Sequence, residues 1–290
     1  MHAERSLRVG EDQVRLGILL LMLLGSLLYQ GCWEERQFLS AYAAAPKPIS
    51  GDAVKLLYRK VRGVPIRFIV ADLNNPCVRV GVVTARRLGK DESIWELLGR
   101  ARPTAAVTGT YFSTTSKLPV GDIVIEGERV HFGGVGTALC ITYDNQVRFI
   151  RQKLHRQRDW SNYRLVLGAG PRLLQNGRVA LYPHGEGFRD KRVYARGKRV
   201  AVGVTQQNKL ILAVVEQPVS LRRLAWLMRA LGATDAIALD GGGSSTLYYR
   251  RQVKVLPKRK LTNLLVVYED NAEYDARVAR LKPLNRVAQR

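Results

Sequence analysis

An aspartate followed by three glycines and two serines is the segment of this chain whose residue types best suit chemistry. It reads Asp240-Gly241-Gly242-Gly243-Ser244-Ser245 and follows the apolar run at residues 236–239. Three consecutive glycines weaken regular structure by roughly 0.5–1 kcal/mol each relative to alanine, so they indicate a backbone that approaches a ligand closely. At a strand end, Asp240 suits a general base, a nucleophile or an orienting hydrogen-bond acceptor. The alternative is a tight turn with an Asx-type aspartate, and the missing Gly-Lys-Ser/Thr excludes a Walker loop.

The elements on either side must position this segment. Ser220 suits the N-cap of a helix in which apolar residues recur at helical spacing from Leu221 to Leu231, and Gly232 is placed to end it. Residues 235–239 then form a strand, and further strands follow at 246–249, 252–256 and 264–268. The aspartate therefore lies between a buried strand and a glycine turn.

Short, β-branched apolar runs separated by turn residues fill most of the remaining chain. They predict one short helix at 93–99 and strands at 66–71, 78–84, 105–112, 122–126, 129–132, 138–143, 146–150, 165–167, 172–174, 200–205 and 210–216. Strands and helices do not alternate strictly. The predicted fold class is therefore α+β, a single β-rich domain with a mixed sheet and a few helices, preceded by an N-terminal hydrophobic segment.

The charge of the 290-residue chain restricts its partners. There are 47 Lys and Arg residues against 24 Asp and Glu, a net charge of +23, which attracts nucleic acid, anionic lipid or phosphate-bearing glycan. The basic residues are spread along the chain, most densely at 189–199, without aromatic-basic stripes, so no nucleic-acid partner is predicted. Three cysteines exclude a disulfide scaffold; Cys77 and Cys140 are predicted to be buried thiols, with a disulfide between them as the alternative.

An uncharged apolar run at residues 16–28 follows Arg5, Arg8 and Arg15, a pattern typical of an export signal. Extended to residue 33, the run reaches eighteen residues, the lower limit for a membrane-spanning helix. Three fates stay open: a retained membrane anchor over residues 16–33, cleavage within residues 41–45, and lipidation of Cys32. The structural alternative is a buried core helix. Each of the three fates predicts an extracytoplasmic location, in the periplasm or at the cell surface.

The changes in composition along the chain predict four parts. Residues 1–33 form a signal or anchor segment, and residues 34–60 form a linker. Residues 61–270 form the folded domain, and residues 271–290 form a basic tail.

The block from Asp240 to Thr246, preceded by a helix ending in Leu-Gly-Ala, resembles the signature of the phosphodiester glycosidase family. Other blocks resemble the family in the same order along the chain. They are Gly-Thr-Tyr-Phe at 109–112, Pro-Val-Gly at 119–121 with Glu-Gly at 126–127, Gly-Pro-Arg-Leu at 170–173 with Asn-Gly at 176–177, Arg-Val-Ala-Val-Gly-Val at 199–204, and Asn-Leu-Leu-Val-Val at 263–267. The resemblance covers about residues 65–270.

The resemblance implies an exported hydrolase that cleaves the glycosidic bond of a sugar-1-phosphodiester and releases free sugar and a phosphomonoester. Such a reaction needs a phosphate clamp and a carboxyl group near the anomeric carbon. Asp240 and Glu216 are the catalytic candidates, and Arg199 is the candidate clamp because guanidinium binds phosphate in a bidentate manner. The other predicted phosphate- or substrate-binding residues are Gly241, Gly242, Gly243, Ser244, Ser245, Thr108, Tyr111 and Arg172. The alternatives are a surface charge for Arg199 and a solvated acid for Glu216.

Three positions depart from the family pattern. Thr108 replaces a usual Asn, Val200 replaces a usual Thr, and Glu216-Gln217-Pro218 replaces an Asp-Gly-Arg-like run. An amide and a hydroxyl differ in hydrogen-bonding reach. The departures motivate an alternative function, a non-catalytic binder of anionic or phosphorylated glycan polymers at the cell envelope.

The predicted partners are a sugar-phosphate or phosphorylated glycan substrate, such as an envelope polymer or exopolysaccharide, and the membrane through residues 16–33. No His, Cys or Glu cluster has zinc-ligand spacing, so no cofactor is predicted. A calcium ion held by Asp and backbone carbonyl oxygens stays an open alternative.

Overall fold

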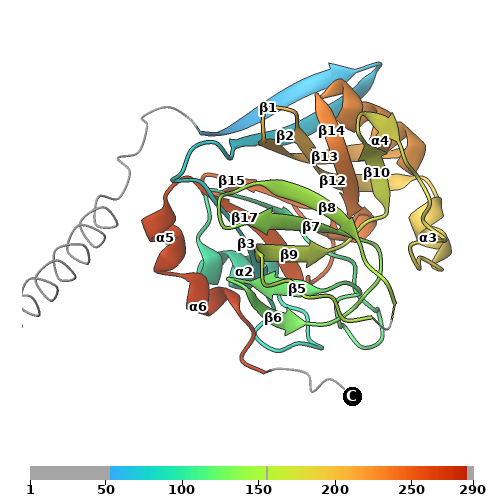
Figure 1. Cartoon of the computed structure of the whole chain (residues 1–290). Helices are drawn as coiled ribbons and strands as arrows, with labels where there is room; N and C mark the ends of the chain where they lie inside the picture. The colour runs from blue at the N-terminus through green and yellow to red at the C-terminus, as the bar shows by residue number, and fades with distance from the viewer. Residues whose placement is uncertain (1–52, 155, 286–290) are drawn as a thin grey trace, which may run out of the picture. The chain divides into compact units, whose positions relative to one another are not determined.

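The computed structural model describes residues 53–154 and 156–285 (Figure 1). The predicted signal or anchor segment at 1–33, the cleavage sites and Cys32 lie outside the described residues. Within the described ranges, no helix is both long enough and apolar enough to cross a membrane.

The largest of three sheets has seven strands in the order β1, β2, β13, β12, β14, β10 and β11. Their bounds are β1 Val54–Val61, β2 Val64–Asp72, β10 Arg172–Gln175, β11 Arg178–Val179, β12 Gly197–Thr205, β13 Lys209–Val219 and β14 Ala233–Leu239. Strands β12 and β14 lie at the centre, where their apolar side chains are buried on both faces. The end of β14 carries Asp240.

Two five-stranded sheets complete the β-structure. One has the order β16, β15, β4, β17 and β3, and the other has the order β6, β5, β9, β7 and β8. Their bounds are β3 Arg79–Thr84, β4 Ala105–Thr108, β5 Ile123–Ile125, β6 Glu128–His131, β7 Thr137–Thr142, β8 Val147–Arg151, β9 Tyr163–Gly168, β15 Leu247–Tyr249, β16 Gln252–Val255 and β17 Asn263–Tyr268.

All strand pairs in the described part of the chain are antiparallel. The prediction of a mixed sheet is therefore wrong, although the prediction of a β-rich fold with few helices is confirmed. The reason lies in the connections. Arg62 and Gly63 alone join β1 to β2, and residues 206–208 join β12 to β13, lengths that suit hairpins, whereas parallel neighbours need long crossovers.

The hydrophobic core is shared by all three sheets. Ile69, Val82, Leu139, Val202 and Leu265, from β2, β3, β7, β12 and β17, belong to one buried cluster. The other face of the seven-stranded sheet packs against α4 (Leu221–Ala230). Helices α2 (Ile94–Ala101), α5 (Asn271–Asp275) and α6 (Val278–Leu281) contribute to a third cluster with β17 and β3.

Helix α4 begins where the sequence predicts. The Ser220 side chain accepts the backbone N–H of Arg223, so it caps the helix, and Leu224 and Met228 are buried against the sheet. Gly232 has φ +96°, a conformation that favours glycine, and β14 starts directly after it. The prediction of an amphipathic helix that leads into the aspartate-bearing strand is confirmed.

The folded unit extends past both predicted domain boundaries. Strand β1 lies in the predicted linker, 34–60, yet it pairs with β2 along its whole length and buries Val54. In the predicted basic tail, Tyr274 and Leu281 are buried, and a Cβ at Gly81 would lie 2.8 Å from the Tyr274 ring. These apolar contacts bring residues 54–60 and 271–281 into the domain. The sequence did not predict them, because charged residues outnumber the few apolar side chains that are buried in these segments.

Cys77 and Cys140 are both buried, as predicted. No disulfide joins them. Burial raises the pKa of the Cys140 thiol, which holds it in the neutral form.

Candidate active site

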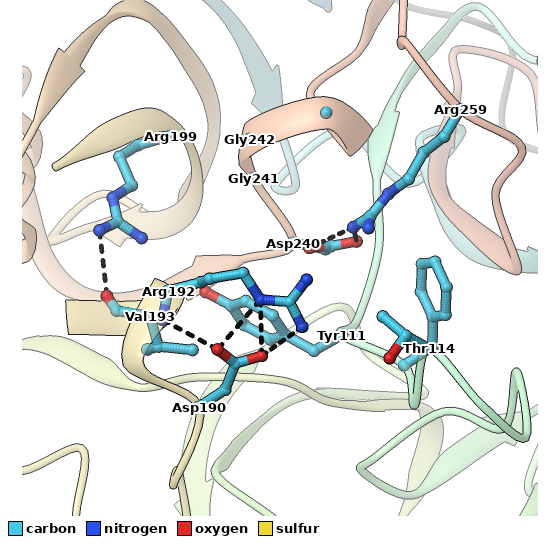
Figure 2. A pocket seen from close by; sticks show the side chains of 12 residues that line it. Tyr111, Thr114, Asp190, Arg192, Val193, Arg199, Asp240, Gly241, Gly242 and Arg259 are labelled. Atoms are coloured by element: carbon cyan, nitrogen blue, oxygen red, sulfur yellow. Dashed lines mark hydrogen bonds and ion pairs between the residues drawn. The ribbon is translucent and has the colours of Figure 1, made fainter. Parts of the chain in front are cut away.

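Asp240 is held at the end of β14 by the neighbouring sheet. Its backbone N–H donates to the carbonyl oxygen of Gly109 at 3.0 Å, which ties the end of β14 to the residue after β4. The Asp240 side chain is only 9% exposed and faces a cavity of about 200 Å³ (Figure 2). The cavity is lined by Tyr111, Phe112, Thr114, Asp190, Arg192, Val193, Arg199, Asp240, Gly241, Gly242, Gly243 and Arg259.

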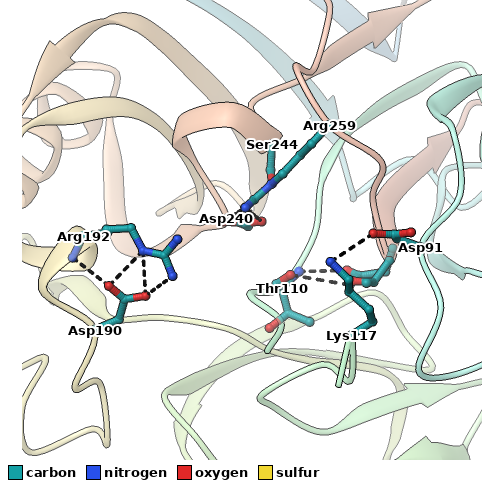
Figure 3. Close-up of polar contacts among 10 residues, drawn as sticks. Asp91, Thr110, Lys117, Asp190, Arg192, Asp240, Ser244 and Arg259 are labelled. Atoms are coloured by element: carbon teal, nitrogen blue, oxygen red, sulfur yellow. Dashed lines mark hydrogen bonds and ion pairs between the residues drawn. The ribbon is translucent and has the colours of Figure 1, made fainter. Parts of the chain in front are cut away.

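Arg259 is the ionic partner of Asp240. Its Nη2 lies 3.1 Å from Asp240 Oδ2 and 3.4 Å from Oδ1, while its Nε donates to Ser244 Oγ at 2.6 Å (Figure 3). The guanidinium carbon also lies 4.9 Å from the centroid of the Phe112 ring, a cation–π contact. Four groups from three parts of the chain therefore fix one another's orientation.

The protonation of Asp240 is set by two opposing effects. Burial raises the pKa of its carboxyl group above the usual aspartate range, because desolvation disfavours the charged form. The charge of Arg259 and hydrogen bonds from Ser244, Arg259 and Gly241 lower the pKa but do not fully offset the burial. A buried carboxyl group with a raised pKa is suited to exchanging a proton.

The loop of three glycines, 241–243, requires glycine at two of its positions. A Cβ at Gly241 would lie 2.6 Å from the carbonyl oxygen of Lys198, so only glycine fits against β12. Gly242 has φ +56° and starts η1 (Gly242–Ser244), a single 3-10 turn. Ser244 and Ser245 are buried, and within the described chain the Ser245 hydroxyl has no hydrogen-bond partner.

Tyr111 presents a second polar group without a partner. Its ring lines the cavity and packs edge-on against Phe188, with the ring centroids 5.4 Å apart. The phenol oxygen is buried and forms no hydrogen bond to any described residue. Burial, followed by the charge of Asp240, raises the pKa of Tyr111, so the hydroxyl keeps its proton and can donate a hydrogen bond to a ligand.

A short helix forms the opposite wall. Asp190 caps α3 (Lys191–Tyr194) by accepting the Arg192 backbone N–H at 2.8 Å, and it pairs with the Arg192 side chain, with Nε 2.9 Å from Oδ2. The cavity walls carry three arginines, at 192, 199 and 259, against the carboxyl groups of Asp190 and Asp240. This charge balance suits an anionic ligand.

Arg199 reaches the cavity wall, but its guanidinium group is already engaged. Nε donates to the Val219 carbonyl oxygen at 3.3 Å, and Nη2 donates to the carbonyl oxygens of Val193, at 3.0 Å, and Ala195. Burial lowers the pKa of Arg199. These contacts tie the C-terminal end of α3 to the last residue of β13, so they give Arg199 a structural role beside its predicted phosphate contact.

Glu216 lies away from the cavity. Its carboxylate pairs with Arg67 of β2 and lies 3.9 Å from Lys198 Nζ. The sequence predicted that Glu216 ends a strand. Strand β13 instead continues to Val219, so Glu216 lies inside it. The structure therefore gives no support to Glu216 as the second catalytic carboxylate.

Four predicted substrate contacts also lie outside the cavity lining: Ser244 and Ser245, which are buried behind it, and Thr108 and Arg172. Arg172 is close to Asp235, with Nη1 and Oδ1 3.5 Å apart, and its Nη2 donates to the Phe149 carbonyl oxygen at 2.5 Å. Thr108 is 2% exposed and pairs with Leu264 of β17. The sequence blocks that contain Thr108 and Arg172 form strands that support the site.

Sequence reasoning missed Arg259, Asp190 and Arg192 as site residues. Arg259 lies in a basic run, 258–260, between β16 and β17. That run was a signal for a charged loop near the glycine turn, because β15 and β16 follow that turn directly. Asp190 and Arg192 lie in the basic segment 189–199, a dense patch of charge in which the sequence singled out neither residue.

No group of three or more His, Cys, Asp or Glu side chains suited to a metal ion occurs among residues 53–154 and 156–285. The calcium alternative stays a prediction without a described ligand set.

The family model described as phosphodiester glycosidase matches residues 101–268, more than half of the chain. The chain belongs to the phosphodiester glycosidase family. All of the site residues named above, from Tyr111 to Arg259, lie in the family-matched segment.

Solved structures share the fold of this family member. A hypothetical protein from Synechocystis matches with a TM-score of 0.65 and 16% identity over 74% of this chain and 62% of its own, so this chain spans less than two thirds of that protein. The zebrafish N-acetylglucosamine-1-phosphodiester alpha-N-acetylglucosaminidase catalytic domain, auto-inhibited by its pro-peptide, matches with a TM-score of 0.60 and 19% identity over 78% and 86%. A candidate exported protein from Burkholderia pseudomallei matches with a TM-score of 0.53 and 15% identity over 71% and 74%. No curated protein sequence matches the chain.

Proposed function

We propose that this family member hydrolyses the glycosidic bond of a sugar joined through its anomeric carbon to a phosphodiester. The observation that carries the proposal is the buried Asp240 carboxyl group at a small cavity with more cationic than anionic side chains. Family membership and the fold shared with the zebrafish glycosidase support the reaction class.

The chemistry follows from the position of Asp240. Its carboxylate takes a proton from a water molecule as the water oxygen attacks the anomeric carbon. The bond between that carbon and the phosphate oxygen breaks, and the electron pair leaves with the phosphomonoester. Because phosphate is a stable anion, it needs little protonation as it leaves. Water and a carboxylate supply the nucleophile and the base, so the proposed reaction requires no cofactor.

The cavity cations stabilise the charge that develops on phosphate. Arg192 and Arg259 face the cavity, and a guanidinium group can donate two parallel hydrogen bonds to phosphate oxygens. The Tyr111 hydroxyl, which has no partner among the described residues, supplies one more donor for a sugar or phosphate oxygen. Each of these donors becomes more effective in a site that excludes water.

A second candidate function is binding without hydrolysis. The observation that favours it is the shortage of carboxylates: Glu216 lies elsewhere, Asp190 is paired with Arg192, and Asp240 is paired with Arg259. A protein with this site could hold an anionic glycan without activating water. Turnover separates the two functions.

We also propose an extracytoplasmic location. The support is the positively charged start and the apolar run at residues 16–28. The Burkholderia pseudomallei protein that shares the fold is a candidate exported protein, which agrees with this location. Retention of residues 16–33 would anchor the domain at the membrane.

Hydrolysis is tested with the full-length chain and a panel of sugar-1-phosphodiesters, with free sugar and phosphomonoester measured together. Asp240→Asn should lower kcat by about 100-fold or more, as loss of a general base does, while substrate binding persists. Asp72→Asn, a surface carboxylate paired with Lys209, is the matched control. Turnover that survives Asp240→Asn would refute the role of Asp240, and binding without turnover across the panel would favour the second function.

A further inference from the structure

A second cavity, of about 310 Å³, lies between the β1–β2 hairpin and α4. We call it the Trp226 groove; its main residues are Arg62, Arg223, Trp226 and Arg229, with Val61 and Leu227. The Trp226 side chain is large and apolar, yet the residue is 44% exposed. An exposed tryptophan among arginines is a feature that neither the core nor the candidate active site explains.

The groove has its own fixed geometry. The guanidinium carbon of Arg62 lies 5.9 Å from the centroid of the Trp226 ring, and Arg223 Nη2 donates to the Arg62 carbonyl oxygen at 2.8 Å. The hairpin and the helix are therefore held against each other, so the ring and the cations do not need to be assembled by a ligand.

The groove is strongly cationic. Three of its seven lining residues are arginines, at 62, 223 and 229, and none is Asp or Glu. Arg59 of β1 lies beside the groove, because its Nη1 donates to the carbonyl oxygen of the lining residue Ala230 at 3.4 Å. Among residues 53–154 and 156–285, no carboxylate forms an ion pair with Arg62, Arg223 or Arg229. Cations without local counterions favour an anionic occupant.

Contacts connect the groove to the catalytic cavity. Helix α4 starts after Val219, whose carbonyl oxygen accepts Arg199 Nε, and the preceding Pro218 carbonyl oxygen accepts Arg196 Nη2 at 3.1 Å. One turn into the helix, Arg223 contacts the hairpin. Basic side chains therefore continue from the cavity wall, past the start of α4, to the groove.

We propose that the Trp226 groove binds a neighbouring repeat of a glycan chain linked by phosphodiesters, while the bond to be cleaved occupies the cavity beside Asp240. This inference rests on the proposed hydrolase function. The exposed face of the Trp226 ring stacks on a sugar ring, and the arginines bind the adjoining phosphate. The occupant is a polymer because the groove and the cavity beside Asp240 share no lining residue, so only a chain of several repeats can contact both at once.

The test compares a long synthetic oligomer of N-acetylglucosamine-1-phosphate with its minimal methyl diester, using the full-length chain. Trp226→Ala, and separately the triple change Arg62→Gln, Arg223→Gln and Arg229→Gln, should raise the KM for the oligomer at least tenfold. The same changes should leave kcat/KM for the minimal diester within twofold. Trp226→Phe keeps an aromatic face and should retain most of the oligomer affinity.

The controls separate the groove from general effects. Trp95→Ala removes another exposed tryptophan, on α2, and should leave the oligomer KM unchanged. Thermal unfolding of every variant shows whether the fold is intact. Oligomer binding is also measured as an equilibrium Kd in the Asp240→Asn background, so it does not depend on turnover.

An unchanged oligomer Kd in the Trp226 and arginine variants would overturn the proposal, as would equal weakening by Trp95→Ala. Loss of binding to phosphatidylglycerol vesicles with unchanged oligomer Kd would identify a membrane surface instead, and would also overturn it. If wild type binds the oligomer through Trp226 but releases no sugar from either substrate, the groove stands and the hydrolase proposal fails.

Discussion

Replacement of Arg259 by glutamine tests whether Asp240 depends on its ionic partner. Breaking a fully buried ion pair by removing one partner costs about 3–5 kcal/mol. The Asp240 side chain is 9% exposed, but Arg259 is 38% exposed, so solvent screens part of the interaction. We therefore expect Arg259→Gln to lower the free energy of unfolding by about 1–3 kcal/mol at neutral pH.

The decrease in the free energy of unfolding caused by Arg259→Gln should depend on pH, because Asp240 changes its protonation. Burial places the folded-state pKa of Asp240 above its unfolded value of about 3.9, so the protein loses stability as pH rises through this window. Removal of Arg259 raises the folded-state pKa further, and each pKa unit adds about 1.4 kcal/mol of loss at high pH. At lower pH Asp240 is neutral in both wild type and Arg259→Gln. The difference in their free energies of unfolding should then fall to the contribution of the lost Arg259–Ser244 hydrogen bond.

The assay is urea unfolding of wild type, Arg259→Gln, Asp240→Asn and the double variant from about pH 4 to about pH 8. The double-mutant cycle should give a coupling energy of about 1–3 kcal/mol at the upper end of that range. Lys258→Gln, which alters the charge of the neighbouring side chain, is the control and should show none of this pH dependence. A coupling below about 0.5 kcal/mol, or a deficit that is independent of pH, would refute the reasoning.

Three further changes test the other residues. Arg199→Ala should lower the free energy of unfolding by about 3 kcal/mol in urea, because three carbonyl oxygens lose their charged donor; a loss of phosphate affinity with unchanged stability would instead support the predicted clamp. Tyr111→Phe should leave stability within about 0.5 kcal/mol, since the hydroxyl has no described partner, and should weaken substrate binding about tenfold by isothermal titration. Glu216→Gln should change kcat less than twofold and stability by less than about 1 kcal/mol, because its ion pair is exposed; a large drop in kcat would restore it as a catalytic candidate.

The sequence predicted the parts of this site that are local. Asp240 and its glycines form one continuous segment, and the helix before it has a recognisable cap and stop. Arg259 reaches Asp240 only because the β15–β16 hairpin brings the chain back beside Gly243, where the Lys258 backbone N–H donates to the Gly243 carbonyl oxygen at 2.7 Å. The periodicity of apolar residues in the sequence does not show that residues 258–259 lie beside Asp240.

Glu216 was misplaced because the end of a strand was misjudged by three residues. Apolar residues stop at Val215, but β13 continues to Val219 along the partner strand β12. Side chains alternate across a strand, so Glu216 lies on the same face of β13 as Val214, which pairs with Arg67 of β2, and its carboxylate meets Arg67 there. Strand ends are set by pairing partners as much as by composition, and the partner was unknown from the sequence.

The pairing of β2 with β13 also bears on how the chain is made. Strand β2 must wait for a partner that ends about 150 residues later, which at 5–20 residues per second takes roughly 7–30 s of synthesis. Until then the β1–β2 hairpin, with Ile66 and Phe68, has no sheet to join, and an isolated hairpin is marginal in water. A nascent chain of this protein therefore exposes an apolar edge for about half of its translation. We expect such a nascent chain to bind a holding chaperone during synthesis.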